Sequence, residues 1–269
     1  MAAVTAMPTV PTTSSAPSPL PPRSGTIRDT GTVRRSEVRA TAWTVTGLAK
    51  VQGDVEVETG TVDGLLSVAG RISAGSLRVR GTLSVVGVVE VRGDLTADGT
   101  LQFGTGLHAG SLVSKGSLRS GAPLRVDRLA SVTGTVEAPT VSAALVELSG
   151  SAEVPGELTA VAAVRARFRG DSRIGTVRAA RVELHGPPTS LIPTLWRAVF
   201  GGRATIHVDR VEADSVELSA VEVGFVRSPS VVLGPGAHVT AVEGTVVKRH
   251  PTSRVGPESR SPPPYGLSR

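Results

Sequence analysis

The acidic side chains of this 269-residue chain are the first candidates for acid–base chemistry. Enzymes that cleave polysaccharides need carboxylates gathered on one face, either for proton transfer or for binding Ca²⁺. Asp54 and Glu56 lie two residues apart and would share one face of a strand, but seventeen residues later the chain has Arg71 and Ser73. The other acidic residues are mostly isolated. The pattern therefore favours a solvated surface over a carbohydrate-active lyase or glycosidase.

The histidines and the glycine motifs offer no stronger catalytic hypothesis. None of the histidines falls at metal-ligand spacing. They are His108, His185, His207, His238 and His250. Residues 233–239 read LGPGAHV, like one hexad of a left-handed acyltransferase helix with His238 as general base, but that fold needs many consecutive hexads. We expect no catalytic residue, no metal site, no cofactor and no small-molecule substrate.

A glycine that returns about every seventeen residues dominates the rest of the chain. The intervals between its successive occurrences run from 16 to 20 residues. These glycines are Gly47, Gly64, Gly81, Gly99, Gly116, Gly134, Gly150, Gly170 and Gly186. A unit of this size is too short for a helical pair or a propeller blade. It fits one coil of a β-solenoid, in which each coil buries its apolar side chains against the next.

Within each repeat the apolar residues alternate as they do in strands. Four residues after the glycine come Val51, Val68, Val85, Phe103, Val154 and Ile174, and eight residues after it come Val55, Ile72, Val89, Leu107, Leu124 and Leu158. The sequence therefore predicts an all-β fold, a single-stranded right-handed β-helix (solenoid) with coils of about 17 residues, over 27–186 and 203–249. About ten to twelve coils, each rising by about 4.8 Å, would give a rod of roughly 50 to 60 Å.

The two ends of the chain differ in composition from the repeats. Residues 1–26 are rich in Pro, Ser, Thr and Ala, and residues 250–269 are basic and rich in Pro, so we expect two disordered tails. Lys248, Arg249 and Arg254, at the start of the second tail, are candidates for contact with an anionic surface. No aromatic residues interleave with the basic ones, so nucleic acid is not an expected partner.

The compartment is inferred from what the chain lacks. It has no cysteine, which excludes a disulfide framework and fits a reducing compartment. The first residues lack the basic start and the continuous apolar stretch of a secretory signal, and no run of about 20 apolar residues would span a bilayer. We expect a cytoplasmic protein, with association to a membrane surface left open.

One segment, residues 187–202 (PPTSLIPTLWRAVFGG), breaks the strand pattern. Its apolar spacing is that of a short amphipathic helix ending at two glycines. The apolar side chains are Leu195, Trp196, Val199 and Phe200. Two roles are open for this insert: a cap that hides an apolar face of the solenoid, or a docking element for another subunit or a membrane surface.

The strand pattern resumes after the insert and ends in a segment with its own motifs. It reads VEADSVEL at 211–218, VG at 223–224, VRS at 226–228, LGPG at 233–236 and VE at 242–243. Coils, insert and closing segment in this order resemble the bactofilin-like, polymer-forming cytoskeletal proteins, and in particular their longer bacterial and archaeal relatives. The resemblance covers about residues 27–247. Ala213 and Ser228 stand where the family pattern has glycine.

The resemblance implies a compact β-helix that stacks end to end into non-polar filaments without nucleotide, as a scaffold for cell shape or for localising partners. Exposed backbone and apolar edges at the terminal coils make such stacking physically plausible. We therefore expect a non-enzymatic, self-assembling structural protein whose main partner is itself, with tails free to reach recruited proteins or a membrane surface. A secreted or surface adhesin with the same repeat is the alternative.

Overall fold

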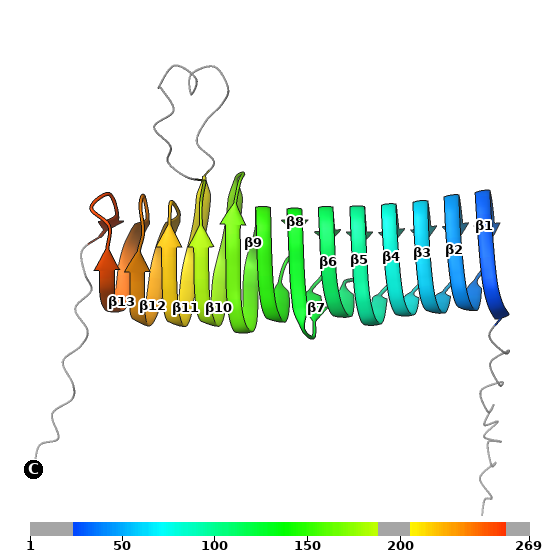
Figure 1. The fold of residues 1–269 in the computed structure, drawn as a ribbon, viewed down its shortest axis with the longest axis horizontal. Coiled ribbons are helices and arrows are strands. Elements are labelled where there is room, and N and C mark those ends of the chain that lie inside the picture. The colour runs from blue at the N-terminus through cyan, green and yellow to red at the C-terminus, as the bar shows by residue number, and fades with distance from the viewer. Residues whose placement is uncertain (1–23, 188–204, 257–269) are drawn as a thin grey trace, which may run out of the picture.

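The computed structural model describes residues 24–187 and 205–256, which form one long β-solenoid of about 13 turns (Figure 1). The prediction of an all-β solenoid with coils of about 17 residues is confirmed, and the described residues contain no helix. The first and last coils lie at opposite ends of the rod. The side chains that carry any function therefore lie either on the long lateral faces or on the two ends.

The strands follow one another along the rod in chain order, and the paired strands are parallel. Most of them cover a large part of one coil; β7 and β8 together make one coil, and the 28-residue β9 makes more than one. The strands are β1 (Ser24–Arg35), β2 (Val38–Val51), β3 (Val55–Val68), β4 (Ile72–Val85), β5 (Val89–Phe103), β6 (Leu107–Ser120), β7 (Leu124–Val126), β8 (Leu129–Glu137), β9 (Val141–Phe168), β10 (Ser172–His185), β11 (Ile206–Ser219), β12 (Glu222–Leu233), β13 (His238–Arg249) and β14 (Arg254–Val255).

Each coil has three short straight faces separated by corners. In β3 the residues 55–57, 60–62 and 66–68 each have buried ends and a more exposed middle, which is the alternation of a strand with one face inward. We call these segments, and those in register with them in other coils, face A, face B and face C. The inward residues of each face fill the core, and the outward residue is the one available for contacts.

Residues in register from coil to coil form columns along the rod. The first inward column of face A is buried in all its members. These are Val38, Val55, Ile72, Val89, Leu107, Leu124, Val141, Leu158, Val177, Val211, Val226 and Val242. Identical or similar side chains therefore stack on one another, and Val, Leu, Ile and Ala fill the interior without large aromatic residues. The predicted inward positions four and eight residues after the glycine are confirmed.

The repeat glycine occupies the corner between faces B and C, where the chain needs a left-handed conformation. Eight glycines from Gly31 to Gly150 stack in register there, with φ between +75° and +141°. A Cβ atom built on Gly99 would lie 2.0 Å from the carbonyl oxygen of Gly81 in the preceding coil. Glycine is thus required twice at this corner, by the backbone angle and by the close approach of the neighbouring coil.

The pattern changes in the C-terminal part of the rod. Gly170 and Gly186, which belong to the sequence repeat, have no left-handed φ. At the corner between faces C and A, the three residues 52–54 of the early coils are replaced by two residues, as at 209–210. The corner between faces B and C is also one residue shorter, 219–220 in place of 63–65, so Val208 pairs with Val223, only fifteen residues later. The later coils keep the same columns with a shorter chain.

The insert leaves the rod at the same corner that holds the stacked glycines. β10 ends face B at His185, and β11 begins face C at Ile206, so the extra residues fall between the two faces. Throughout the pairing of β10 with β11 the register stays constant at 34 residues, as between Ser172 and Ile206. The predicted apolar side chains of the insert, Leu195, Trp196, Val199 and Phe200, lie outside the residues that the structure describes.

The solenoid extends beyond the limits predicted from composition. Its first strand begins at Ser24 rather than residue 27. At the other end, Arg254 and Val255 form β14 and pair with His238 and Val239, so the coils continue past residue 249. Arg254 thus belongs to the last described coil and not to a tail.

The stacked glycines predict a position-specific effect of adding one methyl group. Gly99→Ala should lower the free energy of unfolding by about 2–4 kcal/mol, because it combines a left-handed φ with a backbone clash. Gly170→Ala is the matched control, since the nearest atom to its added Cβ would be the Cβ of Ser151 at an ordinary 3.5 Å. Chemical denaturation of both variants measures the difference. Equal effects would contradict the proposed role of the glycine corner.

Candidate functional site

The carboxylates considered for acid–base chemistry take part in contacts between coils. Asp54 lies at the corner between faces C and A, where its Oδ1 accepts a 2.8 Å hydrogen bond from the backbone N–H of Arg71. That bond, helped by the guanidinium of Arg71, holds the pKa of Asp54 below its usual value. Within residues 24–187 and 205–256, no group of three or more His, Asp or Glu side chains is placed to hold a metal ion.

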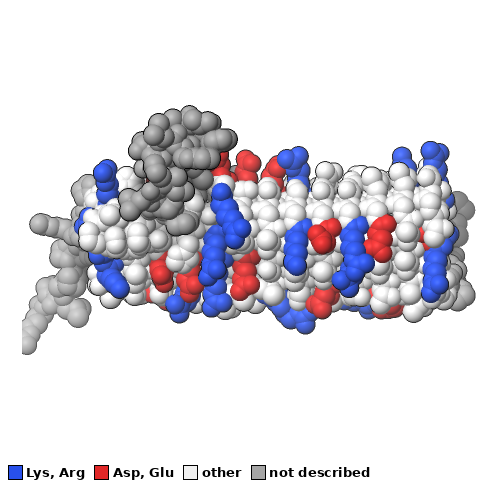
Figure 2. Space-filling view, turned by 45° about the horizontal axis from the view of Figure 1, so that its top comes forward, with Lys and Arg blue, Asp and Glu red and all other residues white. Residues whose placement is uncertain are grey.

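Ion pairs link adjacent coils, or coils two apart, along the lateral surface, and their partners are largely exposed. Five of them in the N-terminal half are Arg71–Asp54, Arg80–Asp63, Arg92–Glu58, Arg119–Glu137 and Arg128–Asp94. On the face seen in Figure 2, basic and acidic side chains are interspersed along the rod. Exposed pairs of this kind contribute little to stability individually. They set the pattern of charge that another molecule would meet.

The N-terminal end of the core is closed by a polar cluster. Asp29 occupies the inward column of face B that is Val45 in the next coil, and it is only 5% exposed. Its carboxylate accepts hydrogen bonds from Arg35 Nε (2.8 Å), Arg35 Nη2 (2.6 Å) and Trp43 Nε1 (2.9 Å). We call these three residues the N-terminal plug. It replaces apolar surface at the end of the stack with a satisfied ion pair.

The charge of Asp29 is maintained by its partners. The hydrogen bond from Arg35 is the main cause that lowers the pKa of Asp29, with further lowering by Trp43, while burial acts in the opposite direction. The same contact raises the pKa of Arg35. Asp29 is therefore ionised under all but acidic conditions.

The C-terminal end is built differently. β14 pairs only with His238 and Val239, so along the rest of β13 the described residues place no strand on the outer edge. Val247 on this edge is 65% exposed. The three basic residues predicted to contact an anionic surface, Lys248, Arg249 and Arg254, are all exposed and lie in this last part of the rod. Arg249 donates a 3.3 Å hydrogen bond to the carbonyl of Ser253.

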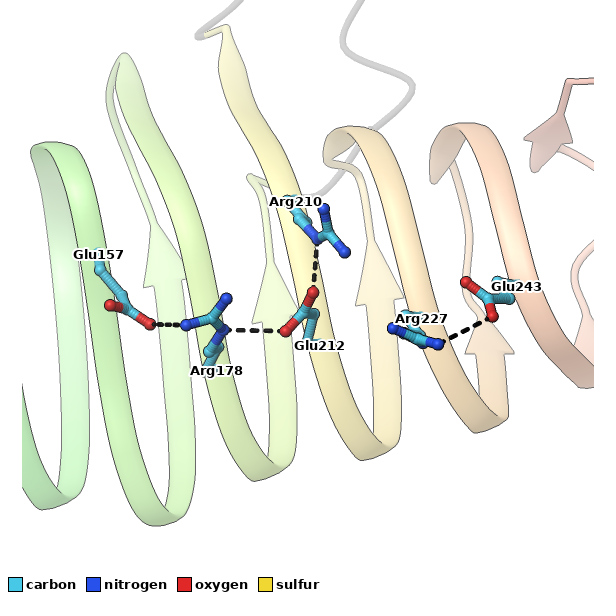
Figure 3. A network of polar contacts seen from close by, with 6 residues as sticks. All are labelled: Glu157, Arg178, Arg210, Glu212, Arg227 and Glu243. Carbon is cyan, nitrogen blue, oxygen red and sulfur yellow. Dashed lines mark hydrogen bonds and ion pairs between the residues drawn. The ribbon is translucent and has the colours of Figure 1, made fainter.

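A ladder of alternating charge runs along face A near the C-terminal end (Figure 3). Its outward residues are in register, one in each of four successive coils. They are Arg178, Glu212, Arg227 and Glu243, and we call them the face A ladder. Within the ladder, nitrogen–oxygen distances are 2.9 Å for Arg178–Glu212 and 3.2 Å for Arg227–Glu243. No such ladder follows from the sequence alone, because its members are 34, 15 and 16 residues apart.

Two further side chains extend the network. Glu157 contacts Arg178 at 2.8 Å, and Arg210 contacts Glu212 at 2.5 Å. The hydrogen bond from Arg178 lowers the pKa of Glu212, and the same bond raises the pKa of Arg178. Arg178 and Glu212 are therefore charged at neutral pH.

An open groove runs beside the face A ladder. The ladder residues form one side, and the small residues that directly follow them line it further: Ala179, Ala213, Ser228 and Gly244. The equivalent inward column in earlier coils alternates valine and alanine, as in Val57, Ala74, Val91, Ala109 and Val126. In the last coils this column holds only alanine, serine and glycine, beside the groove.

The remaining residues singled out in the sequence are dispersed. His238 is the exposed first residue of β13, in register with Glu222 and Arg254. His108 contacts Asp127 at 3.0 Å on the surface. Among the described residues, no helix is long and apolar enough to cross a membrane.

Comparisons with other proteins yield no match: no protein-family model, no curated protein and no solved structure matches the chain. The arguments about function therefore depend on the geometry described above.

Sequence reasoning missed the N-terminal plug and the face A ladder. The plug had a detectable signal in the sequence. Gly31 precedes Gly47 by sixteen residues, so the glycine repeat begins one coil earlier than its predicted start at Gly47. Asp29, two residues before Gly31, then takes the position that Val45 holds two residues before Gly47. The ladder had none, because the insert and the shortened corners change the spacing of its members.

The N-terminal plug predicts a pH-dependent contribution to stability. Because the folded-state pKa of Asp29 is depressed, its contribution is present above the unfolded value near 3.8 and is lost as pH falls through the folded value. Asp29→Asn should lower the Tm at pH 7. The difference in Tm between this variant and the wild type should become smaller as the pH falls. Thermal melts between pH 7 and pH 2.5 measure this difference, and Glu137→Gln, in an exposed pair, serves as the control. A difference in Tm that does not change with pH would rule out the charge of Asp29 as the cause of that difference.

Proposed function

We propose that this protein is a non-enzymatic structural scaffold that self-assembles end to end into nucleotide-independent filaments or sheets, in the manner that its bactofilin-like sequence features imply. The observation that carries the proposal is the open C-terminal end. From Val242 to Arg249 the outer edge of β13 has no neighbouring strand among the described residues, and Val247 is exposed. An unpaired edge of this kind is a template for pairing with another chain.

The construction of the rod supports the same proposal. Most core columns run the length of the rod, so a further copy at an end would continue a hydrogen-bonded and largely apolar stack. The face B column is charged at both ends, with Asp29 in the first coil and Arg249 in the last. β1 also has an open outer edge among the described residues, but the N-terminal plug makes that end polar. End contacts would therefore combine backbone hydrogen bonds with apolar contact mainly from the C-terminal side.

The charges at the ends predict the salt dependence of this assembly. β1 carries three arginines against Asp29, a net charge of +2, and residues 242–256 carry Lys248, Arg249 and Arg254 against Glu243, also +2. Two positive ends repel each other, and salt screens that repulsion. The same positive C-terminal end supports a second partner, an anionic membrane surface, for a scaffold located in the cytoplasm.

The first test is negative-stain electron microscopy with light scattering on the purified full chain, without nucleotide or metal, over a range of salt concentrations. We expect filaments or sheets, and more scattering as salt increases. A monodisperse short rod at every salt concentration would overturn end-to-end assembly.

A pair of variants locates the contact at the C-terminal end. Val247→Asp should reduce assembly because an end contact would bury its unpaired carboxylate, which costs more than the partial relief of repulsion between the two positive ends gains. Val161→Asp is the matched control, since Val161 is also an exposed valine, 80% accessible, but lies on the lateral surface in β9. Sedimentation of the assembled fraction measures both. Equal loss of assembly in the two variants would contradict an end contact.

A further inference from the structure

The face A ladder is self-complementary, and we propose that it forms a lateral interface between two copies of this chain laid antiparallel. The ladder reads Arg178, Glu212, Arg227, Glu243 toward the C-terminal end, which is plus, minus, plus, minus. Read in the opposite direction it is minus, plus, minus, plus. A second copy turned end for end therefore presents the opposite charge at each of the four ladder positions, which we call rungs.

The two-fold axis of this pair passes between Glu212 and Arg227. Arg178 then faces Glu243 of the second copy, and Glu212 faces Arg227 of the second copy, and each contact occurs twice because the interface is isologous. Both ladders have the same spacing, since successive coils of a solenoid are separated by the inter-strand distance of about 4.8 Å. All four rungs are matched simultaneously.

Other arrangements of the same two faces satisfy fewer charges. Two parallel copies at equal height place every ladder residue opposite itself, with like charges in contact. A parallel pair shifted by one coil matches three rungs but is not closed by symmetry. An antiparallel pair shifted by one coil again opposes like charges, which is costly when they are juxtaposed. The alternation thus selects one orientation and one register.

The surface beside the ladder is suited to a close lateral contact. The groove leaves room for side chains of a second copy, because small residues such as Ala213 and Gly244 line it, together with Asp214 and Pro229. On the other side of the ladder the guanidinium of Arg210 lies over the ring of Phe225, 5.0 Å from its centroid, which fixes a flat cationic surface. The ladder side chains are held by their neighbours within the chain before any partner arrives.

The expected contact is weak for one pair of copies and effective for many. Each rung is exposed, so its ion pairs contribute modestly and are screened by salt. When copies are already joined into filaments, lateral contacts act together and their combined affinity rises. The lateral contact weakens with salt, whereas the proposed end contact strengthens with it. The two contacts are therefore distinguishable by ionic strength.

Sedimentation velocity on the full chain at low ionic strength tests this interface, with Val247→Asp in every sample to suppress end contacts. The chain with the wild-type ladder should show an average mass that rises with concentration from 27.5 kDa toward twice that value. In high salt this mass should fall again. Arg178→Glu alone and Glu243→Arg alone should each weaken dimerisation by about tenfold or more, because each creates two like-charge contacts in a dimer.

A chain carrying both Arg178→Glu and Glu243→Arg tests the orientation. In the antiparallel pair the new Glu of each copy faces the new Arg of the other, so the double variant should dimerise like the wild-type ladder. In a parallel pair shifted by one coil the new Glu faces Glu212 and the new Arg faces Arg227, so the double variant should not dimerise. Circular dichroism of each variant confirms that it is folded, and a variant that is unfolded alone is replaced by the neutral Arg178→Gln or Glu243→Gln.

Arg119→Glu is the control for a change of net charge. Arg119 belongs to a similar exposed pair with Glu137, but it lies on face C. It should leave dimerisation unchanged. A concentration-independent mass for the wild-type ladder, an equal effect of Arg119→Glu, or a double variant that dimerises no better than the single variants would each overturn the proposal. Loss of filaments in Val247→Asp alone would leave it standing, because that result concerns the end contact.

Discussion

The close in-register stacking of one coil on the next is the constraint on which the rest of this structure depends. Every coil must bring its backbone within hydrogen-bonding distance of its neighbours over nearly its whole length, corners included. At the corner between faces B and C this leaves no space for a Cβ atom, as the 2.2 Å approach of a Cβ on Gly116 to the carbonyl of Gly99 shows. The glycine repeat is the sequence consequence of that constraint.

Because the coils stack in register, equivalent positions of successive coils form columns, and the outward columns together form the lateral surface. An inward column needs apolar residues of similar size in each coil, which accounts for the recurrence of Val, Leu and Ile. An outward column has no such requirement, so its side chains are free to alternate in charge from coil to coil. The Arg178–Glu212 pair belongs to such a column, and neither residue has a role in the core. Lateral surface chemistry and core stability are therefore largely independent in this fold.

The same reasoning explains how much the sequence could predict. The fold class, the coil length and the inward positions follow from a local period, and the structure confirms them. The failures occur where the period changes. Gly170 continues the sequence repeat without the left-handed φ, in a corner (167–171) that is longer than the corner 63–65 of β3. Arg178, eight residues after it, points outward, while its neighbour Val177 is buried. The candidate surfaces depend on register across the insert and the shortened corners, which no local pattern specifies.

The two ends of the rod are chemically different, and this gives the rod a direction. The N-terminal plug ends a core column with an ion pair that is already satisfied within the chain, so that end has little to gain by burying itself further. Among the residues that the structure describes, the outer edge of β13 keeps an exposed valine and unpaired backbone, so burial there is favourable. In the proposed antiparallel pair, the open end of each copy lies beside β10 of the other. A third copy arriving end-on would then meet two chains at once, which couples growth along the rod to pairing across it.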